Sequence, residues 1–286
     1  IKKSKFLAHK LIEVIKRNAF LVENLEMDKI ISLEKLFGRN PGEKEIKQAE
    51  IFKFISFNCV KKGWAAMPLN YLLRIYPELP LYKKTMTEVF ELVFEKDLVY
   101  PKENYEMEEF LCDKVNNWIN NTIESNINTS VNFPKKIEGD ITLTKEQDQA
   151  LDSILKSHIS IVTGGAGCGK TTLIKQLVYN LRARGEPFLL TSFTGKAVLR
   201  MKETLPDYCQ ECCFTMSRLI HKKNTKQPTP EFAHLIIDEA SMISNSLIYN
   251  LLDNFSHYFK IYFFGDCNQL PPVGSGNFFQ EIINCG

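Results

Sequence analysis

Residues 159–178 read ISIVTGGAGCGKTTLIKQLV. The run ISIVT is short and apolar, as expected of a buried strand, and an amphipathic helical pattern runs from Thr171 to Arg182. The loop between them, GGAGCGKT, matches G-x-x-x-x-G-K-[ST] at every position. Its glycines let successive backbone N–H groups turn inward at the start of a helix, so these residues predict a phosphate-binding loop.

The chemistry of such a loop assigns roles to individual residues. The Lys170 ammonium is expected to reach the β and γ phosphates of ATP, and the Thr171 hydroxyl is expected to ligate Mg²⁺. ATP and Mg²⁺ are therefore the predicted cofactors. The predicted nucleotide-binding residues of the loop are Gly164, Gly165, Ala166, Gly167, Cys168, Gly169, Lys170, Thr171 and Thr172.

Two carboxylates follow a second apolar run. HLIIDE (residues 234–239) ends in Asp238 and Glu239, whose side chains should leave a strand in different directions. We expect Asp238 to hold Mg²⁺ and Glu239 to orient or deprotonate the water that attacks the γ-phosphate. The pair is expected one strand away from the phosphate loop. A solvated acidic loop after a core strand is the alternative interpretation.

A third apolar run, KIYFFGD (residues 260–266), is followed by CNQLPPVG (residues 267–274). The Gln269 carboxamide in this loop could bond the γ-phosphate and lose that bond after hydrolysis, while two prolines make the loop rigid. The candidate catalytic residues are thus Lys170, Asp238, Glu239 and Gln269.

The order of these runs predicts the fold of the second half of the chain. Short apolar runs at residues 159–164, 187–193, 234–239 and 260–266 are separated by helical stretches. Continuous apolar strands that alternate with helices predict an α/β fold with a parallel sheet and helices on both faces. Residues 141–286 are expected to form this P-loop ATPase domain.

The region before it has a different pattern. Residues 1–125 have helical periodicity, and residues 126–140 (NINTSVNFPKKIEGD) lose it and gain Asn, Pro and Gly. We therefore expect a smaller all-α domain followed by a linker.

Within that first domain, a helix is expected to end at Gly63. A capping box of Thr85 and Glu88 predicts a helix that includes Val93, and residues 98–100 predict a short strand. A further helix has apolar residues at spacings of three and four over residues 107–119. Helices followed by a strand could form a winged-helix module that touches nucleic acid. A helical bundle that serves as scaffold, or that offers a surface to a protein partner, is the alternative.

Several segments together resemble a known family. DEASM (residues 238–242) and GDCNQLPPVG (residues 265–274) resemble motifs of the RecD-like helicases of superfamily 1. FTGKA (residues 193–197) is similar to motif Ia of that family. TMSRLI (residues 215–220) is similar to its T-x-H-R-L-L segment, with Ser217 in place of the usual His.

The resemblance covers residues 141–282 closely and the earlier residues loosely. It implies a RecA-like motor domain, ATP-dependent DNA helicase activity and movement from 5′ to 3′ on single-stranded DNA. The expected partners are single-stranded DNA and duplex junctions, contacted mostly through phosphates. The implied DNA-contacting residues are Thr194, Lys196, Thr215, Arg218, Pro271 and Pro272.

The family also has a second RecA-like domain, which supplies an arginine to the ATP site. No candidate segment for it follows Gly286, so this chain is expected to be a piece of a longer protein. We expect the piece alone to bind nucleotide and to hydrolyse it slowly.

Two further segments have two interpretations each. LTKEQ (residues 143–147) resembles the family's adenine-reading segment, in which the Gln147 carboxamide would pair with the adenine edge. A capping box of Thr144 and Gln147 explains the same residues, and both roles can coexist. Residues 221–228 fall where the family places a wedge that splits the duplex, but a solvated surface loop explains them equally well.

Composition sets the outer limits. A length of 286 residues predicts roughly two domains, and a net charge of 36 − 34 = +2 gives no argument for a nucleic-acid partner. No apolar run is long enough to cross a membrane, and the first residues do not form a signal peptide. We expect a monomeric, intracellular protein with no membrane partner.

The eight cysteines lack the even framework of a disulfide-bonded domain, so reduced thiols are expected. Cys209, Cys212 and Cys213, with His221 as a conceivable fourth ligand, raise the possibility of a zinc site. Structural zinc sites normally have two spaced ligand pairs, and the second pair is missing here, so zinc is the minor alternative.

Three other functions stay open at this stage. An RNA-directed superfamily 1 helicase would be stimulated by RNA rather than by DNA. A P-loop small-molecule kinase would need an acceptor alcohol, whereas the acid pair and Gln269 suit attack by water. A nucleotide-switched binding module without motor activity would fail to displace strands.

Overall fold

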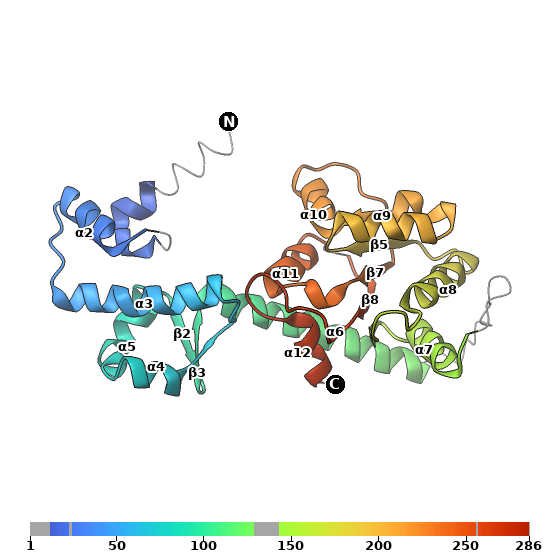
Figure 1. The fold of residues 1–286 in the computed structure, drawn as a ribbon, viewed down its shortest axis with the longest axis horizontal. Helices are drawn as coiled ribbons and strands as arrows, with labels where there is room; N and C mark the ends of the chain where they lie inside the picture. The colour runs from blue at the N-terminus through green and yellow to red at the C-terminus, as the bar shows by residue number, and fades with distance from the viewer. Residues whose placement is uncertain (1–11, 23–24, 129–142, 256, 286) are drawn as a thin grey trace. The chain divides into compact units, whose positions relative to one another are not determined.

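The computed structural model describes residues 12–22, 25–128, 143–255 and 257–285. They fall into two compact units, Ile1–Glu106 and Met107–Gly286. The elements of both units are labelled in Figure 1. The expected linker at residues 126–140 lies largely outside the described residues.

The first unit is mainly helical. Its elements, in chain order, are η1 (Ala19–Leu21), α2 (Met27–Leu36), α3 (Glu43–Lys61), β1 (Met67–Pro68), α4 (Leu69–Ile75), α5 (Leu79–Glu88), β2 (Leu92–Glu95), β3 (Leu98–Pro101) and the first turns of α6 (Lys102–Asn128). The three strands form an antiparallel sheet in the order β1-β3-β2. The expectation of helices is confirmed, but the description all-α needs correction because of this sheet.

From α3 onward, the first unit has the element order helix, strand, helix, helix and β-hairpin. That is the order of a winged-helix module, with β2 and β3 as the wing. Cys59, Met67, Leu72 and Val99 are fully buried and belong to one apolar core that joins the helices to the sheet. The sequence predicted the last strand of this module but not its partner β2.

The expected helix through Val93 is wrong. Helix α5 ends at Glu88, so Thr85 lies in its last turn, and Val93 pairs with Tyr100 in the hairpin. Glu91 adopts a left-handed backbone (φ 53), which ends any helical continuation. A short apolar run cannot be assigned to helix or strand by spacing alone, which is the reason for the error.

The second unit is an α/β domain. Its remaining elements are α7 (Lys145–Lys156), β4 (Ile159–Thr163), α8 (Lys170–Ala183), β5 (Phe188–Ser192), α9 (Gly195–Thr204), η2 (Asp207–Cys212), β6 (Cys213–Thr215), α10 (Met216–Asn224), β7 (His234–Asp238), η3 (Ala240–Met242), α11 (Asn245–Asp253), β8 (Lys260–Gly265) and α12 (Phe278–Cys285). Five strands form a parallel sheet in the order β4-β8-β7-β5-β6. The predicted parallel α/β sheet is confirmed, and β6 is an addition too short to be seen as an apolar run.

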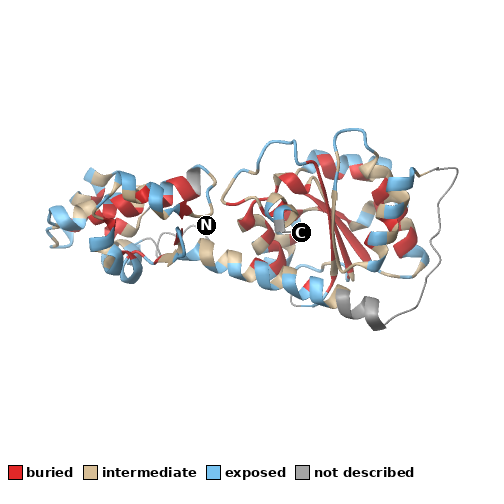
Figure 2. Cartoon of the chain, turned by 90° about the horizontal axis from the view of Figure 1, so that it is seen from below, coloured by how far each residue is buried: buried red, intermediate tan, exposed pale blue. Residues whose placement is uncertain are grey.

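Helices cover both faces of this sheet, as predicted. Neighbouring residues on one strand point to opposite faces, so Leu189 packs in the core with α10, α11 and α12 while Leu190 packs in the core with α7, α8 and α9. Figure 2 shows the buried central strands enclosed between partly exposed helices.

Helix α6 also packs on this sheet. From Met107 onward it belongs to the second unit, and the Trp118 indole donates a hydrogen bond to the Phe259 carbonyl at 2.7 Å. The sequence placed the whole of residues 107–119 in the first domain. An apolar stripe shows that one helix face is buried but does not say against what, so the division at residue 106 could not be read from it.

Candidate active site

The carboxyl ends of the parallel strands place the predicted catalytic segments at one edge of the sheet. The phosphate loop follows β4, the acid pair ends β7, and the loop with Gln269 follows β8. Because β8 lies between β4 and β7, the acid pair is two strands from the phosphate loop rather than one.

The phosphate loop needs its glycines for two separate reasons. Gly167 (φ 78) and Gly169 (φ 85) have left-handed backbones, which side chains disfavour. A Cβ at Gly169 would also lie 2.3 Å from Nε2 of Gln147, whereas Gly165 and Gly167 face open space. The loop is therefore closed on the Gln147 side and open at Gly165 and Gly167, which suits a cradle for phosphate groups.

Lys170, the first residue of α8, turns its side chain back into the loop. Its ammonium donates to the carbonyl oxygens of Gly164 and, at 2.9 Å, of Gly165. Thr171 and Thr172 are half-buried in the first turn of the same helix. A cation and a helix start on one loop are the arrangement that binds phosphate.

Gln147 forms the capping box that the sequence allowed. Its Oε1 accepts from Thr144 N–H at 3.0 Å, and its own N–H donates to the Thr144 hydroxyl at 3.2 Å. Its Nε2 also donates to the Cys168 carbonyl at 3.1 Å, so Gln147 joins α7 to the phosphate loop. Its contact with adenine stays a prediction.

Asp238 ends β7 in a partly desolvated position. Burial raises the pKa of its carboxyl, the hydrogen bond from Glu239 N–H at 2.9 Å lowers it, and the charge of Glu239 raises it further. The positive charge of Lys170 lowers the same pKa. A carboxylate and the hydroxyl of Thr171 are hard oxygen ligands of the kind Mg²⁺ prefers, so these residues fit the ion.

Glu239 has an unusual backbone for a non-glycine residue. Its φ is 56 and its ψ is 38, in the left-handed region. Its Oε2 accepts hydrogen bonds from Thr194 Oγ1 at 3.2 Å and Ser192 Oγ at 3.4 Å. Glu239 is thus bonded to β5 and to the residue that caps α9, and the sequence missed Ser192 because a single serine at a strand end carries no motif.

Gln269 is tied to the loop that follows the acid pair. Its Oε1 accepts from Ser241 Oγ at 3.0 Å, while its side chain remains exposed. Asp266, at the end of β8, accepts from Asn268 N–H at 2.9 Å and so fixes the start of the same loop. Ser241 joins the β7 and β8 loops, and this link was visible only in part, as the serine of DEASM.

The residues assigned to DNA gather at the same sheet edge. Thr194 caps α9 by accepting from Ala197 N–H at 3.1 Å, and Thr215 caps α10 by accepting from Arg218 N–H at 3.2 Å. These helices follow the neighbouring strands β5 and β6. Lys196 and Arg218 are exposed in their first turns.

The loop after β8 exposes apolar side chains, and it contains the two prolines that were assigned to DNA. Pro271 is exposed and Pro272 is half-buried. Leu270 and Val273, which flank them, are 81% and 90% exposed. Contact of the prolines with DNA is not tested by this geometry and stays a prediction.

The cysteine cluster does not resemble a metal site. Cys209 and Cys213 are buried, and burial raises the pKa of the Cys213 thiol to about 11. His221 is exposed. Across the described residues, no group of three or more His, Cys, Asp or Glu side chains is placed to hold a metal ion.

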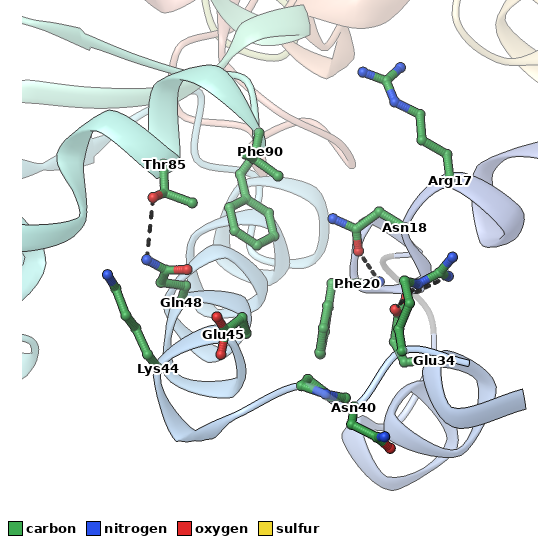
Figure 3. A pocket seen from close by; sticks show the side chains of 13 residues that line it. Arg17, Asn18, Phe20, Glu34, Asn40, Lys44, Glu45, Gln48, Thr85 and Phe90 are labelled. Atoms are coloured by element: carbon green, nitrogen blue, oxygen red, sulfur yellow. Dashed lines mark hydrogen bonds and ion pairs between the residues drawn. The ribbon is translucent and has the colours of Figure 1, made fainter. Parts of the chain in front are cut away.

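A separate cavity of about 520 Å³ lies in the first unit. Its wall includes the buried rings of Phe20 and Phe90, and the Gln48 amide donates to Thr85 at 3.3 Å on one side (Figure 3). Arg17 adds a positive charge at its edge. None of the predicted site residues lines it.

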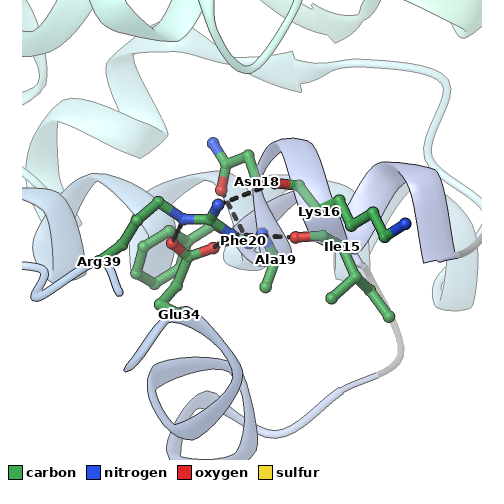
Figure 4. A network of polar contacts seen from close by, with 7 residues as sticks. All are labelled: Ile15, Lys16, Asn18, Ala19, Phe20, Glu34 and Arg39. Atoms are coloured by element: carbon green, nitrogen blue, oxygen red, sulfur yellow. Dashed lines mark hydrogen bonds and ion pairs between the residues drawn. The ribbon is translucent and has the colours of Figure 1, made fainter. Parts of the chain in front are cut away.

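Beside this cavity, a buried carboxylate organises the start of the first unit. Glu34 accepts hydrogen bonds from the Ala19 N–H and from the Arg39 guanidinium (Figure 4). Arg39 also donates to the carbonyls of Lys16 at 2.8 Å and Ile15 at 3.0 Å. Burial alone would raise the pKa of Glu34, but the bonds from Arg39 and Ala19 hold it below its ordinary value.

No helix in the described part of the chain has the length and apolar character needed to cross a membrane.

The second unit is similar in sequence to several known proteins. Residues 147–275 match the family model described as AAA domain. The ATP-dependent RecD2 DNA helicase of Deinococcus radiodurans is 31% identical over 140 residues, which is 47% of this chain and 19% of that protein. The RecBCD enzyme subunit RecD of Buchnera aphidicola is 29% identical over 220 residues, which is 68% of this chain and 36% of that protein.

Among solved structures, the Pif1 helicase from Candida albicans has a TM-score of 0.36 and 27% identity, over 46% of this chain and 34% of that chain. The two RecD relatives are much longer than the matching region, since this chain covers only 19% and 36% of their lengths.

The second unit is a nucleotide-binding α/β domain with a phosphate loop and an acid pair on one sheet edge. Over much of its length, this domain is similar in sequence to the AAA domain family and to the RecD and RecD2 helicase proteins.

Proposed function

We propose that the protein is an ATP-dependent DNA helicase whose first motor domain is the second unit of this chain. The observation that carries the proposal is the shared edge of one parallel sheet. There the Lys170 loop and the acid pair of Asp238 and Glu239 lie with two capped helix starts that expose Lys196 and Arg218. A helicase needs both features because ATP hydrolysis must act on a bound strand.

The ATP site has the groups that water attack on a terminal phosphate requires. Mg²⁺, held by Thr171 and Asp238, would neutralise charge on the phosphates when bound. Lys170 stabilises the same charge, and Glu239 orients the attacking water and accepts its proton. Gln269 responds to the presence or loss of the γ-phosphate through its carboxamide, which Ser241 now orients.

The strand contacts follow from helix starts and basic side chains. The N-termini of α9 and α10 offer unpaired backbone N–H groups to phosphates, and Lys196 and Arg218 supply positive charge beside them. Contacts to phosphates do not read sequence, so we assign a track for single-stranded DNA without sequence preference. Thr194, Thr215, Pro271 and Pro272 complete the proposed track.

Direction and wider organisation are also proposals. Movement from 5′ to 3′ rests on the family resemblance. The name of the RecD2 relative supports action on DNA, and an intracellular location is part of the proposal. The winged-helix-like first unit is a candidate surface for duplex or for a protein partner. We assign a monomer as the functional unit, and we expect residues 1–286 alone to bind nucleotide and hydrolyse it slowly.

The test is strand displacement by the full-length protein on duplexes with a 5′ or a 3′ single-stranded tail. Unwinding of the 5′-tailed DNA in the presence of ATP and Mg²⁺, and its loss in Lys170→Ala, is the expected result. If the protein unwinds RNA duplexes of the same design in preference to DNA, the proposal of a DNA substrate is wrong and the protein is an RNA helicase. Failure on every tailed duplex, with ATP binding intact, would favour a nucleotide-switched binding module.

A further inference from the structure

The carboxylate of Glu239 is bound from one side only among its described contacts. The hydroxyls of Ser192 and Thr194 both donate to its Oε2, at 3.4 and 3.2 Å. Ser192 ends β5 and Thr194 follows it, and β5 pairs with β7 along its length. The hydroxyls therefore reach Glu239 from the neighbouring strand β5.

The strand order gives this contact a direction. In the order β4-β8-β7-β5-β6, strand β5 lies on the opposite side of β7 from β4, which carries the phosphate loop. A carboxylate held by β5 hydroxyls is held toward the side of β7 that is remote from the loop. Its activation of water at a γ-phosphate would require release from these donors.

The backbone of Glu239 is suited to such a change. A non-glycine residue at φ 56 and ψ 38 is in a sparsely populated region, and strain of this kind often marks segments with two arrangements. The hydrogen bonds from neutral hydroxyls are weaker than those from charged donors, so a competing ligand can break them.

Thr194 connects this carboxylate to the proposed strand track. Its hydroxyl donates to Glu239 and accepts from Ala197 N–H at 3.1 Å, which caps α9. Lys196 is exposed in the first turn of that helix. A phosphate bound at the start of α9 would compete with Glu239 for the single hydroxyl proton of Thr194.

We propose that Ser192 and Thr194 are positioning residues that hold Glu239 away from the phosphate loop until a strand at the start of α9 releases it. The inference rests on the proposed helicase function and adds to it a reason for ATP hydrolysis to depend on a bound strand. Neither hydroxyl touches the reacting atoms, and both act through the orientation of Glu239.

The experiment measures steady-state ATP hydrolysis by the full-length protein without nucleic acid and with a saturating single-stranded oligodeoxythymidine. Thr194→Val keeps the shape of the side chain and removes the hydroxyl. We expect the rate without DNA to rise roughly three- to tenfold, and the stimulation by DNA to shrink by a similar factor. Thr194→Ser, which retains the hydroxyl, should restore the wild-type ratio.

A second variant separates this effect from DNA binding. The Ser192 side chain is fully buried, so Ser192→Ala cannot remove a contact with the strand. In Ser192→Ala we expect the rate without DNA to rise less than in Thr194→Val, because the bond from Ser192 to Glu239 is longer than the bond from Thr194. Thr191→Val is the matched control, since Thr191 is buried on the same strand and its hydroxyl has no hydrogen-bond partner among the described residues. Its two rates should equal those of the wild type.

The outcomes separate this inference from the function on which it rests. If DNA does not stimulate the wild-type protein at all, the helicase proposal fails with it. If DNA stimulates the wild type and Thr194→Val equally, only the holding of Glu239 is overturned. A fall in the rate of Thr194→Val without DNA would also overturn it, because the hydroxyl would then assist the carboxylate. Fluorescence anisotropy with labelled oligodeoxythymidine confirms saturation for each variant.

Discussion

Two glutamates, one in each unit, have carboxylates bound by hydrogen bonds, and their donors differ in kind. Glu34 accepts from the Arg39 guanidinium and from the Ala19 backbone N–H, and it lies in helix α2. Glu239 accepts from two neutral hydroxyls and has a left-handed backbone. Glu34 is buried, whereas Glu239 is only half-buried.

The difference separates a carboxylate that is fixed within the fold from one for which we propose a catalytic role. Hydrogen bonds from a guanidinium are about twice as strong as neutral ones, and Arg39 extends them to the carbonyls of residues 15 and 16. Glu34 therefore fixes the start of the first unit in one arrangement. Glu239 is held by hydrogen bonds from neutral hydroxyls, which a ligand can replace, and this fits the catalytic role that we propose for it.

The largest expected effect is that of Glu239→Gln on catalysis. The amide can still accept hydrogen bonds but cannot take a proton from water, so ATP hydrolysis should fall about 100-fold or more. Binding of a fluorescent ATP analogue and the melting temperature should stay close to wild type. Lys170→Ala is the control that should lose nucleotide binding as well. Hydrolysis near the wild-type rate in Glu239→Gln would remove this residue from the catalytic set.

Glu34→Gln should have the opposite profile. The Arg39 guanidinium loses its charged acceptor, so we expect the first unit to lose about 1–3 kcal/mol of stability in urea unfolding. ATP hydrolysis should be unchanged. Glu45→Gln is the matched control, because Glu45 is exposed and its bond to Gly42 N–H is one that glutamine can also make. Equal stability of the two variants would contradict a structural role for Glu34.

The stability difference between the wild type and Glu34→Gln should also depend on pH. The pKa of Glu34 is lower in the folded protein than its ordinary value of 4.5. Its contribution is therefore complete above that value and is lost as the pH falls through the lower, folded pKa. The difference in unfolding free energy between wild type and Glu34→Gln should shrink over that range. A difference that stays constant down to strongly acidic pH would mean that the carboxylate charge is not involved.

The smallest expected effect is that of relieving the backbone at Glu239. Asparagine tolerates the left-handed region better than glutamate, so Glu239→Asn should raise the unfolding free energy by roughly 0.5 kcal/mol while hydrolysis is lost. Glu91→Asn is the control, since Glu91 has a similar φ of 53 in the exposed turn before β2. It should gain similar stability and keep full activity. A loss of stability in Glu239→Asn would show that the hydroxyl bonds outweigh the strain.

Local motifs in the sequence predicted the phosphate loop, the acid pair and four of the five strands of the parallel sheet. Each depends on residues close together in the chain: glycines that permit left-handed backbones, a lysine at a helix start, or a run of apolar residues long enough for a buried strand. The capping box of Thr144 and Gln147 is of the same kind. Strand β6 was missed because it has only three residues.

Two errors of the sequence-based predictions have a common origin. An apolar pattern shows that side chains are buried but does not show which element they pack against. The apolar stripe on α6 gave no sign that Trp118 packs in the second unit, beside its parallel sheet. The apolar residues around Val93 fit a helix as well as a hairpin. Ser192 and Ser241 were missed because each acts through a residue more than 25 positions away in the chain.

The amino acids alone therefore specified the groups of the proposed phosphate site, because the residues expected to bind phosphate and Mg²⁺ lie in short contiguous segments with strict backbone requirements. The order of the strands was settled only by folding. That order places β8 between the loop and the acid pair and puts the hydroxyls of β5 beside Glu239. Side-chain contacts between strands depend on which strands become neighbours, and packing over the whole sheet determines this rather than any local pattern.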